Sequence, residues 1–168
     1  MSEHNSSVLN DAGILPLEGA SVVIIYTEWN EFIINELMSG CDRILEKHNI
    51  KDVTKIQVPG AVEIPFAIKQ YWEQTKGTGV QPSAFISLGC VIRGETPHFD
   101  YVCKAVTEGV LQLNLSLPVP TIFGVLTVNN IEQANERLGG VHGHKGEEAA
   151  LAALKMMSFQ RQLALGKR

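Results

Sequence analysis

Residues 88–100, LGCVIRGETPHFD, place an imidazole where a strand gives way to a helix. Small and β-branched residues end at Arg93. Thr96 and Pro97 then suit the N-cap and the first position of a helix, so His98 falls in its first turn. The helix dipole disfavours a charged imidazolium there, and a neutral ring can accept a proton and later return it. His98 is therefore a candidate general acid and base, and the alternative is a half-exposed histidine without a chemical role.

The same helix start could hold an anion. Gly94, Glu95 and Thr96 would present backbone N–H groups that have no partner inside the helix, which is the usual seat of a phosphate. The Glu95 carboxylate opposes an anion unless it points into solvent. A short helix predicted over residues 131–138 starts with capping-box spacing and has Arg137 near its end. Arg137 could supply the positive charge, or it could simply complement the negative end of that helix dipole.

Trp29 and Glu63 could bind a flat, hydroxylated ligand. Trp29 follows a strand-like run where no core position is expected, and its indole offers a stacking surface for a heteroaromatic ring. Glu63 follows a Pro-Gly-Ala turn and could accept hydrogen bonds from ligand hydroxyls or ring N–H groups. Each residue also has a purely structural interpretation: Trp29 could pack over a helix entry, and Glu63 could be a first-turn acid favoured by the helix dipole.

Strand-like and helix-like patterns alternate along the chain and must position these residues. β-branched runs cover residues 21–27, 54–58, 84–92 and 121–128, and apolar residues at helical spacing follow each of them. Crossover connections of this kind are right-handed and place helices on both sides of a parallel sheet. We therefore predict an α/β fold: a three-layer, doubly wound, flavodoxin-like and mostly parallel four-stranded sheet flanked by helices.

The two ends of the chain extend this outline. Residues 1–12 are polar and small and are predicted to form a flexible tail, whereas residues 13–168 are predicted to form a single domain. Residues 14–17 could add a short N-terminal edge strand to the sheet despite Pro16. The terminal helix is expected from Glu147 to about residue 165, with two acids in its first turn.

Four unusual polar stretches fall at the carboxyl ends of the predicted strands. They are TEWN (residues 27–30), VPGAVE (58–63), GCVIRGETPH (89–98) and the TVNN segment beyond Phe123. In open parallel sheets the ligand crevice lies beyond these ends, along what we call the carboxyl edge of the sheet. The shared position of the four stretches indicates a ligand site more strongly than any single motif does.

Composition and charge exclude several classes of protein. Of 168 residues, 45% are hydrophobic, which suits a globular protein with its own core. The net charge is −4 and the 14 Lys and Arg residues are scattered along the chain, so nucleic acid is not an expected partner. No apolar run approaches the roughly 20 residues of a membrane span, and the polar N-terminus lacks the features of an export signal. The 3 widely spaced cysteines favour reduced thiols and a cytoplasmic location.

The GVHGHKG segment at residues 140–146 has some features of a phosphate-binding loop and of a metal site, but we predict neither. It has the glycine density of a phosphate-binding loop, but it lacks the Gly-Lys-Ser/Thr ending and does not follow the first strand. His142 and His144 alternate with glycines, without an acid or thiol at ligand spacing, so no metal site is expected.

The chain closely resembles the 6,7-dimethyl-8-ribityllumazine synthase family over residues 21–157. Five segments carry the resemblance in the family's order and spacing: EWNEFI, VPGAVEIPFA, LGCVIRGETPHFDYV, PTIFGVLTVNNIEQANER and HKGEEAA. The family condenses 5-amino-6-(D-ribitylamino)uracil with 3,4-dihydroxy-2-butanone 4-phosphate, releasing phosphate and water, in the penultimate step of riboflavin biosynthesis. The resemblance therefore implies a transferase that needs no metal or cofactor.

The resemblance also implies roles for the candidate residues. His98 matches the histidine that shuttles protons, and Trp29 matches the aromatic residue that stacks on the pyrimidine. Phe123 matches an aromatic residue that enters the site from a neighbouring subunit. The matches to pyrimidine and ribityl contacts are Ala61, Val62, Glu63, Cys90, Val91 and Ile92. The matches at the phosphate are Glu95, Thr96, Arg137 and Lys145.

Four positions depart from the family's pattern in ways that bear on affinity more than on the reaction. Trp29 replaces a common phenylalanine, and Val62 replaces a bulkier or hydroxylated residue. Glu95 replaces a small residue, and His144 replaces an asparagine beside Lys145.

Assembly and partners follow from the resemblance alone. The family forms pentamers with active sites between subunits, so we expect a homo-oligomer: a pentamer, or a decamer or 60-subunit shell built from pentamers. Association with riboflavin synthase is a further expectation. The alternative function is that of a paralogue that binds flavin or forms a shell with weak or no turnover, and such a protein would be indifferent to the loss of His98.

Overall fold

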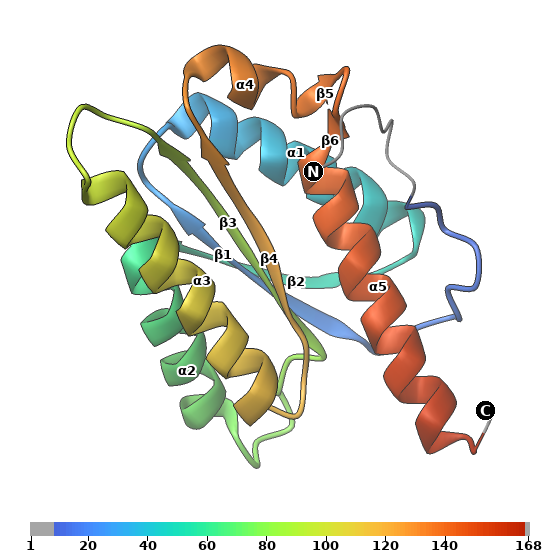
Figure 1. Cartoon of the computed structure of the whole chain (residues 1–168). Helices are drawn as coiled ribbons and strands as arrows, with labels where there is room; N and C mark the ends of the chain where they lie inside the picture. Colours follow the sequence, from blue (N-terminus) through green and yellow to red (C-terminus); the bar gives the residue numbers. More distant parts are fainter. Residues whose placement is uncertain (1–8, 167–168) are drawn as a thin grey trace.

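Four parallel strands form the centre of the chain in its computed structural model, which describes residues 9–166 (Figure 1). The strands lie in the order β2-β1-β3-β4, and every pairing among them is parallel. Their bounds are Ser21–Thr27 for β1, Asp52–Val58 for β2, Ala84–Ile92 for β3 and Thr121–Val128 for β4. The strand order reverses between β1 and β3, which is where doubly wound sheets form a ligand crevice.

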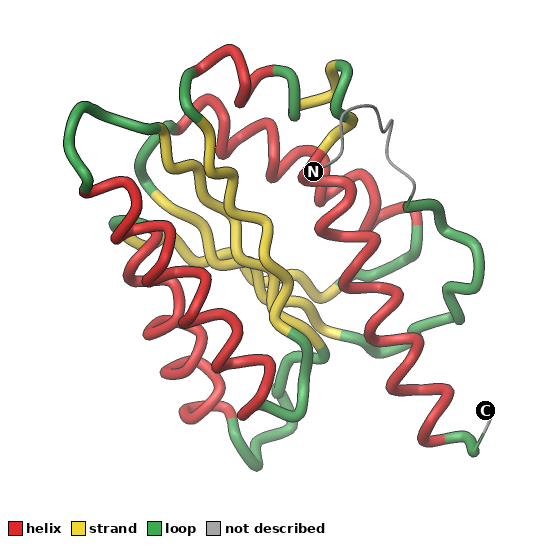
Figure 2. Tube along the Cα trace, viewed as in Figure 1, coloured by secondary structure: helices red, strands yellow, loops and turns green. Residues whose placement is uncertain are grey.

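Helices cover both faces of the sheet, as Figure 2 shows. α1 (Glu31–Lys47) and α5 (Lys145–Ala164) lie on one face, and α2 (Ile64–Thr75) and α3 (His98–Ser116) lie on the other. The predicted three-layer α/β fold is therefore confirmed. The shorter elements are a 3-10 turn at Ala61–Glu63, α4 at Ile131–Asn135, and a hairpin of β5 (Leu138–Gly140) and β6 (Gly143–His144).

The continuous apolar run of β1 is a consequence of these layers. Val22 and Ile24 pack into the core formed with α1 and α5, whereas Val23 and Ile25 pack into the core formed with α2 and α3. All four side chains are fully buried. Successive side chains of a strand point to opposite faces, and both faces of this sheet carry helices, so neither set can be polar.

The N-terminal edge strand predicted at residues 14–17 is wrong. This segment pairs with no strand and follows α5 instead: the Leu15 N–H donates to Ser158 Oγ (3.0 Å), and the Arg161 guanidinium donates to the Pro16 carbonyl oxygen. Leu17 is buried in the core. Side chains of α5 thus satisfy backbone groups that a strand would have paired with the sheet, and Pro16 has no N–H to offer.

Residues 1–8 of the predicted tail lie outside the described part of the chain. The described end of that segment contacts the fold, since Lys47 Nζ lies 2.6 Å from Asp11 Oδ2 and Lys155 Nζ donates to the Ala12 carbonyl oxygen (3.0 Å). Asp11 and Ala12 are therefore tied to α1 and α5.

Candidate functional site

The loops that carry the predicted site residues leave the sheet side by side along its carboxyl edge, at the upper left in Figure 1. β1 and β2 end in register, as do β3 and β4. One further residue extends each pairing: the Glu28 N–H donates to the Val58 carbonyl oxygen (3.0 Å), and the Arg93 N–H donates to that of Val128 (2.9 Å). The parallel register therefore brings together segments that are far apart in the sequence.

Gly60 brings Trp29 and Glu63 together on this edge. A Cβ atom at Gly60 would lie 3.1 Å from Glu63 Oε2 and 3.8 Å from Trp29 Cδ1, so the glycine leaves room for the carboxylate and the indole to converge. Gly60 is extended (φ −155°, ψ −178°), and it provides space rather than backbone freedom. The indole is 72% exposed, which leaves it open to a ligand. An aromatic surface thus adjoins a carboxylate that can accept hydrogen bonds.

Asn30 fixes the turn that carries Trp29, and the sequence reasoning missed it. Asn30 precedes α1 in the left-handed conformation (φ 61°, ψ 47°), which asparagine tolerates better than most residues. Its Nδ2 donates a 2.9 Å hydrogen bond to the carbonyl oxygen of Cys90 in β3. An asparagine between a strand and a helix does indicate a turn. Its partner, however, is 60 positions away and has no signal in the sequence.

The other residues predicted to contact the pyrimidine and ribityl groups line the same edge. Val62 and Glu63 are exposed, whereas Ala61, Cys90, Val91 and Ile92 are partly or fully buried. Burial raises the pKa of the Cys90 thiol to about 11, so the group is a neutral thiol at physiological pH and a poor nucleophile. Cys90 contributes to the edge through packing and its backbone, not through thiolate chemistry.

His98 is exposed and is the first residue of α3. The predicted Thr96 cap is wrong, because Pro97 occupies the N-cap position in a helical conformation (φ −63°, ψ −3°) and no side chain caps this end. The Pro97 carbonyl oxygen already accepts from the Asp100 N–H (3.0 Å), so the first turn forms without a threonine hydroxyl. An uncapped helix start presents backbone N–H groups beside the imidazole.

The residues predicted to bind phosphate fall into two groups. Glu95 and Thr96 are exposed in the loop before α3, next to His98. Arg137 and Lys145 lie beyond α4, where the Lys145 N–H donates to the Arg137 carbonyl oxygen (2.9 Å). Within residues 9–166, no hydrogen bond or ion pair joins one group directly to the other.

Both cations of the second group already have a partner inside the chain. Arg137 Nη1 donates to the Gln133 carbonyl oxygen (2.7 Å), which holds the guanidinium against α4. Lys145 Nζ lies 2.8 Å from a carboxylate oxygen of Glu148. Arg137 therefore keeps its full positive charge toward a ligand, whereas that of Lys145 is partly compensated.

Phe123 lies away from the carboxyl edge of its own chain. It precedes Val128, the last residue of β4, by five residues, a separation of about 16 Å along a strand. Its side chain is 41% exposed. The structure therefore does not bring Phe123 to the site that Trp29 and Glu63 form.

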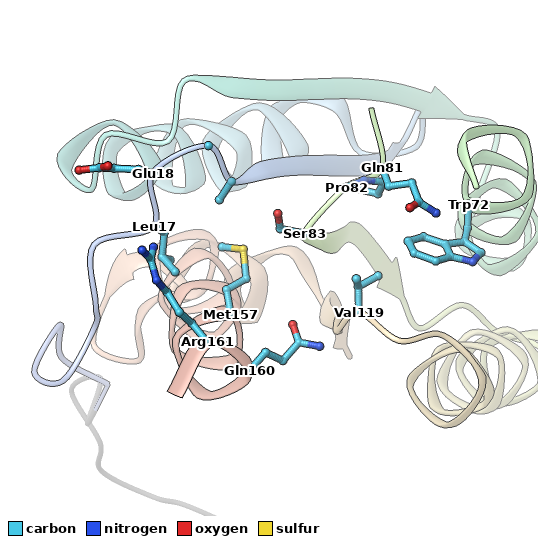
Figure 3. Close-up of a pocket in the computed structure, with 12 residues that line it drawn as sticks. Leu17, Glu18, Trp72, Gln81, Pro82, Ser83, Val119, Met157, Gln160 and Arg161 are labelled. Carbon is cyan, nitrogen blue, oxygen red and sulfur yellow. The ribbon is translucent and has the colours of Figure 1, made fainter. Parts of the chain in front are cut away.

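A recess of about 400 Å³ lies at the opposite, amino-terminal end of the strands (Figure 3). Trp72, Ser83, Met157 and Arg161 are among the residues that line it, and no predicted site residue is. The predicted residues instead lie on an open edge of the single chain.

The described residues contain neither a candidate metal site nor a candidate membrane-spanning helix. Among residues 9–166, no three or more His, Cys, Asp and Glu side chains are grouped closely enough to hold a metal ion. His142 Nε2 lies 3.5 Å from Glu136 Oε2, whereas His144 is buried and its Nδ1 accepts from the Glu147 N–H (3.4 Å). In the same part of the chain, every helix is too short or too polar to cross a bilayer.

A parallel sheet between two helix pairs, with an indole, a carboxylate and an imidazole on its carboxyl edge, is the architecture of a doubly wound α/β enzyme. Comparison with known proteins narrows this class. A model of the 6,7-dimethyl-8-ribityllumazine synthase family matches residues 19–161, and the chain belongs to this family. It is accordingly a transferase of riboflavin biosynthesis.

Relatives described as 6,7-dimethyl-8-ribityllumazine synthase support this assignment over most of the chain. The protein of Parabacteroides distasonis is 42% identical over 161 residues, which cover 95% of this chain and 94% of the relative. That of Cytophaga hutchinsonii is 42% identical over 94% of this chain and 98% of its own. That of Bacteroides fragilis is 44% identical over 81% and 93%. The alternative of a flavin-binding or shell-forming paralogue finds no support among them.

Proposed function

We propose that the chain condenses 5-amino-6-(D-ribitylamino)uracil with 3,4-dihydroxy-2-butanone 4-phosphate to 6,7-dimethyl-8-ribityllumazine, phosphate and water. The observation that carries this proposal is the convergence of the Trp29 indole and the Glu63 carboxylate across Gly60. A flat pyrimidinedione with a hydroxylated side chain requires an aromatic surface next to a hydrogen-bond acceptor. This edge supplies both.

His98 moves protons in this mechanism. The amine condenses with the ketone and one water leaves, and phosphate is then eliminated. Attack of the ribitylamino nitrogen on the remaining carbonyl carbon, with loss of a second water, closes the ring. These steps move protons on nitrogen, oxygen and carbon, and one imidazole can act as acceptor and then as donor. Such a group contributes about 10²–10⁴ in rate, and holding the two reactants together supplies much of the remainder.

The phosphate is held by backbone N–H groups near Glu95 and Thr96, with Arg137 and Lys145 as the cations. Hydrogen bonding to the Gln133 carbonyl oxygen orients the Arg137 guanidinium before the substrate arrives. Within one chain, no hydrogen bond or ion pair joins the loop that carries Glu95 and Thr96 directly to Arg137 or Lys145. We therefore place Arg137 and Lys145 of one copy opposite His98 of another.

A homo-oligomer, a pentamer in its simplest form, follows from this placement. Phe66 of α2 and Tyr101 and Leu115 of α3 are 69%, 71% and 74% exposed, and exposed apolar surface of this kind marks protein contacts. Phe123, too far from its own carboxyl edge, is proposed to reach the site of a neighbouring copy. Decamers, 60-subunit shells and association with riboflavin synthase would build on this unit in the cytoplasm.

The purified full chain, mixed with both substrates, tests the reaction through the absorbance of the lumazine product. A protein-free control is needed because the condensation also proceeds slowly without a catalyst. We expect a clear fall in rate for His98→Ala and a near-complete loss for Arg137→Ala. An unaffected rate in both variants would exclude the assigned roles.

Mixing these two variants tests the shared site. If each site combines His98 of one copy with Arg137 of the next, equal mixing after dissociation and reassembly restores activity at about a quarter of the sites. If His98 and Arg137 of the same copy act in one site, the mixture stays as inactive as the two separate variants.

A further inference from the structure

Arg93, the first residue after β3, makes several side-chain contacts at once. Its Nη2 lies 2.8 Å from Asp100 Oδ1 and its Nη1 3.4 Å from Asp100 Oδ2, while its Nε donates to Asn129 Oδ1 (3.2 Å). The guanidinium carbon also lies 4.1 Å from the centroid of the Phe99 ring. A planar guanidinium with five N–H donors can make these contacts together, and a lysine ammonium cannot.

The contact between Arg93 and Asp100 closes the loop between β3 and α3. These two residues flank residues 94–97 and also His98. Residues 94–97 are exposed, and a Cβ atom at Gly94 would meet no atom within 4 Å, so packing does not hold the loop. The start of α3 has no side-chain cap either. The Arg93 guanidinium therefore spans the loop and limits where it can lie.

Arg93 also joins this loop to the segment after β4. Its partner Asn129 donates from its backbone N–H to Gln133 Oε1 (2.8 Å). The carbonyl oxygen of the same Gln133 accepts from Arg137 Nη1 (2.7 Å). A continuous series of polar contacts thus runs from Asp100 through Arg93, Asn129 and Gln133 to Arg137.

Neither folding stability nor direct phosphate binding accounts well for this arrangement. The side chains of Arg93 and Asp100 are 43% and 60% exposed, and ion pairs at such exposure contribute little to stability. The guanidinium faces the Asp100 carboxylate, which would repel a phosphate at the same place.

We propose that Arg93 is a positioning residue: by holding Asp100, Phe99 and Asn129 it fixes the loop that presents His98. This inference rests on the proposed function. Replacing the guanidinium leaves the reacting groups present but lets the loop move, and a misplacement of about 1 Å can cost on the order of 10²-fold in rate.

Steady-state kinetics of full-length variants test the proposal. Arg93→Lys and Asp100→Asn should each lower kcat by about tenfold or more. The kcat of the double variant should be no lower than that of the less active single variant, because either substitution alone already breaks the contact between residues 93 and 100. The KM for the pyrimidine and the melting temperatures should stay near the parent values. Lys55→Gln, which breaks an exposed ion pair of 2.7 Å with Asp42, is the matched control and should leave kcat unchanged.

Direct phosphate binding by Arg93 predicts a different pattern. Asp100→Asn would then leave kcat unchanged and lower the KM of the phosphate substrate, and the effects of the two substitutions would combine independently in the double variant. That pattern, or parent kinetics in Arg93→Lys, overturns the positioning role. Hydrogen exchange of residues 94–98 provides a readout without turnover: it should quicken in Arg93→Lys and Asp100→Asn but not in Lys55→Gln. An inactive parent enzyme would contradict the proposed function itself.

Discussion

Asn30 Nδ2 donates a 2.9 Å hydrogen bond to the carbonyl oxygen of Cys90, and this bond ties the turn after β1 to the end of β3. The turn presents the Trp29 indole, which is 72% exposed and has little packing of its own to orient it. The direction of the proposed stacking surface therefore depends on one polar contact between neighbouring strands.

Asn30→Gly should weaken pyrimidine binding without unfolding the chain. Glycine keeps the left-handed backbone but removes the bond to Cys90, and the loss of about 1 kcal/mol corresponds to a rise of about fivefold in KM. Asn30→Ala should show the same rise in KM and also lose about 1–2 kcal/mol of folding stability, because alanine is strained in this conformation. Kinetics with urea denaturation separate the two effects, and a parent KM in both variants would exclude the role of Asn30.

Gly60→Ala should affect binding and spare stability. The added Cβ would lie 3.1 Å from Glu63 Oε2, so the carboxylate must move, and its exposure allows it to do so. Because the backbone of Gly60 is extended, alanine adopts it without strain. We expect the KM for the pyrimidine to rise by about tenfold with an unchanged melting temperature. Gly79→Ala, where no atom lies within 4 Å, is the control; similar kinetics for the two variants would contradict the prediction.

Gly146→Ala should destabilise the fold. A Cβ atom at Gly146 would lie 2.0 Å from the Leu37 carbonyl oxygen, and backbone atoms of a packed helix cannot move aside cheaply. The same close approach lets Cys41 Sγ donate to the Gly146 carbonyl oxygen (3.1 Å). We expect a loss of about 3 kcal/mol or more in the free energy of unfolding, measured by urea denaturation. A loss no larger than that of Gly79→Ala would show that α1 and α5 are not so closely packed.

His144 should make folding stability depend on pH. Burial lowers the pKa of its imidazole from the ordinary 6.5. The positive charge of Arg43 also lowers this pKa, whereas the negative charges of Glu147 and Glu36 raise it. Its Nδ1 accepts from the Glu147 N–H, which requires an unprotonated nitrogen, and its Nε2 is buried without a hydrogen-bond partner. As the pH falls, the unfolded chain therefore takes up this proton before the folded chain does. The stabilising contribution is complete above about pH 6.5 and is lost as the pH falls through the folded pKa.

Urea denaturation at a series of pH values measures this effect. The free energy of unfolding should fall more steeply below about pH 6.5 in the parent chain than in His144→Asn, which keeps an acceptor for the start of α5 but cannot be protonated. Equal slopes in the two proteins would show that His144 is not the group responsible.

Local pattern was sufficient to predict most of the fold. β3 and β4 have the bounds expected from their apolar runs, Ala84–Ile92 and Thr121–Val128, because a strand buried on both faces must be apolar at nearly every position. The same reasoning failed at residues 14–17. That segment has enough apolar residues for a strand, but Ser158 and Arg161 of α5 satisfy its backbone groups instead.

The sequence singled out several residues of the candidate site but not their arrangement. Residue type and position singled out Trp29, Glu63 and His98, since each is a chemically capable side chain in the connection or first helical residue that follows a strand. Thr96 was assigned as a cap from residue type, and the backbone of Pro97 made that cap unnecessary.

The sequence by itself determined the alternation of strands and helices and the edge of the sheet at which polar loops gather, because burial and periodicity are properties of neighbouring positions. Only the tertiary structure decided that Asn30 bonds to Cys90 and that Arg93 joins Asn129. These contacts link residues 60 and 36 positions apart. Their approach depends on the register of parallel strands, and no local pattern encodes which side chain will stand opposite another once the strands are paired.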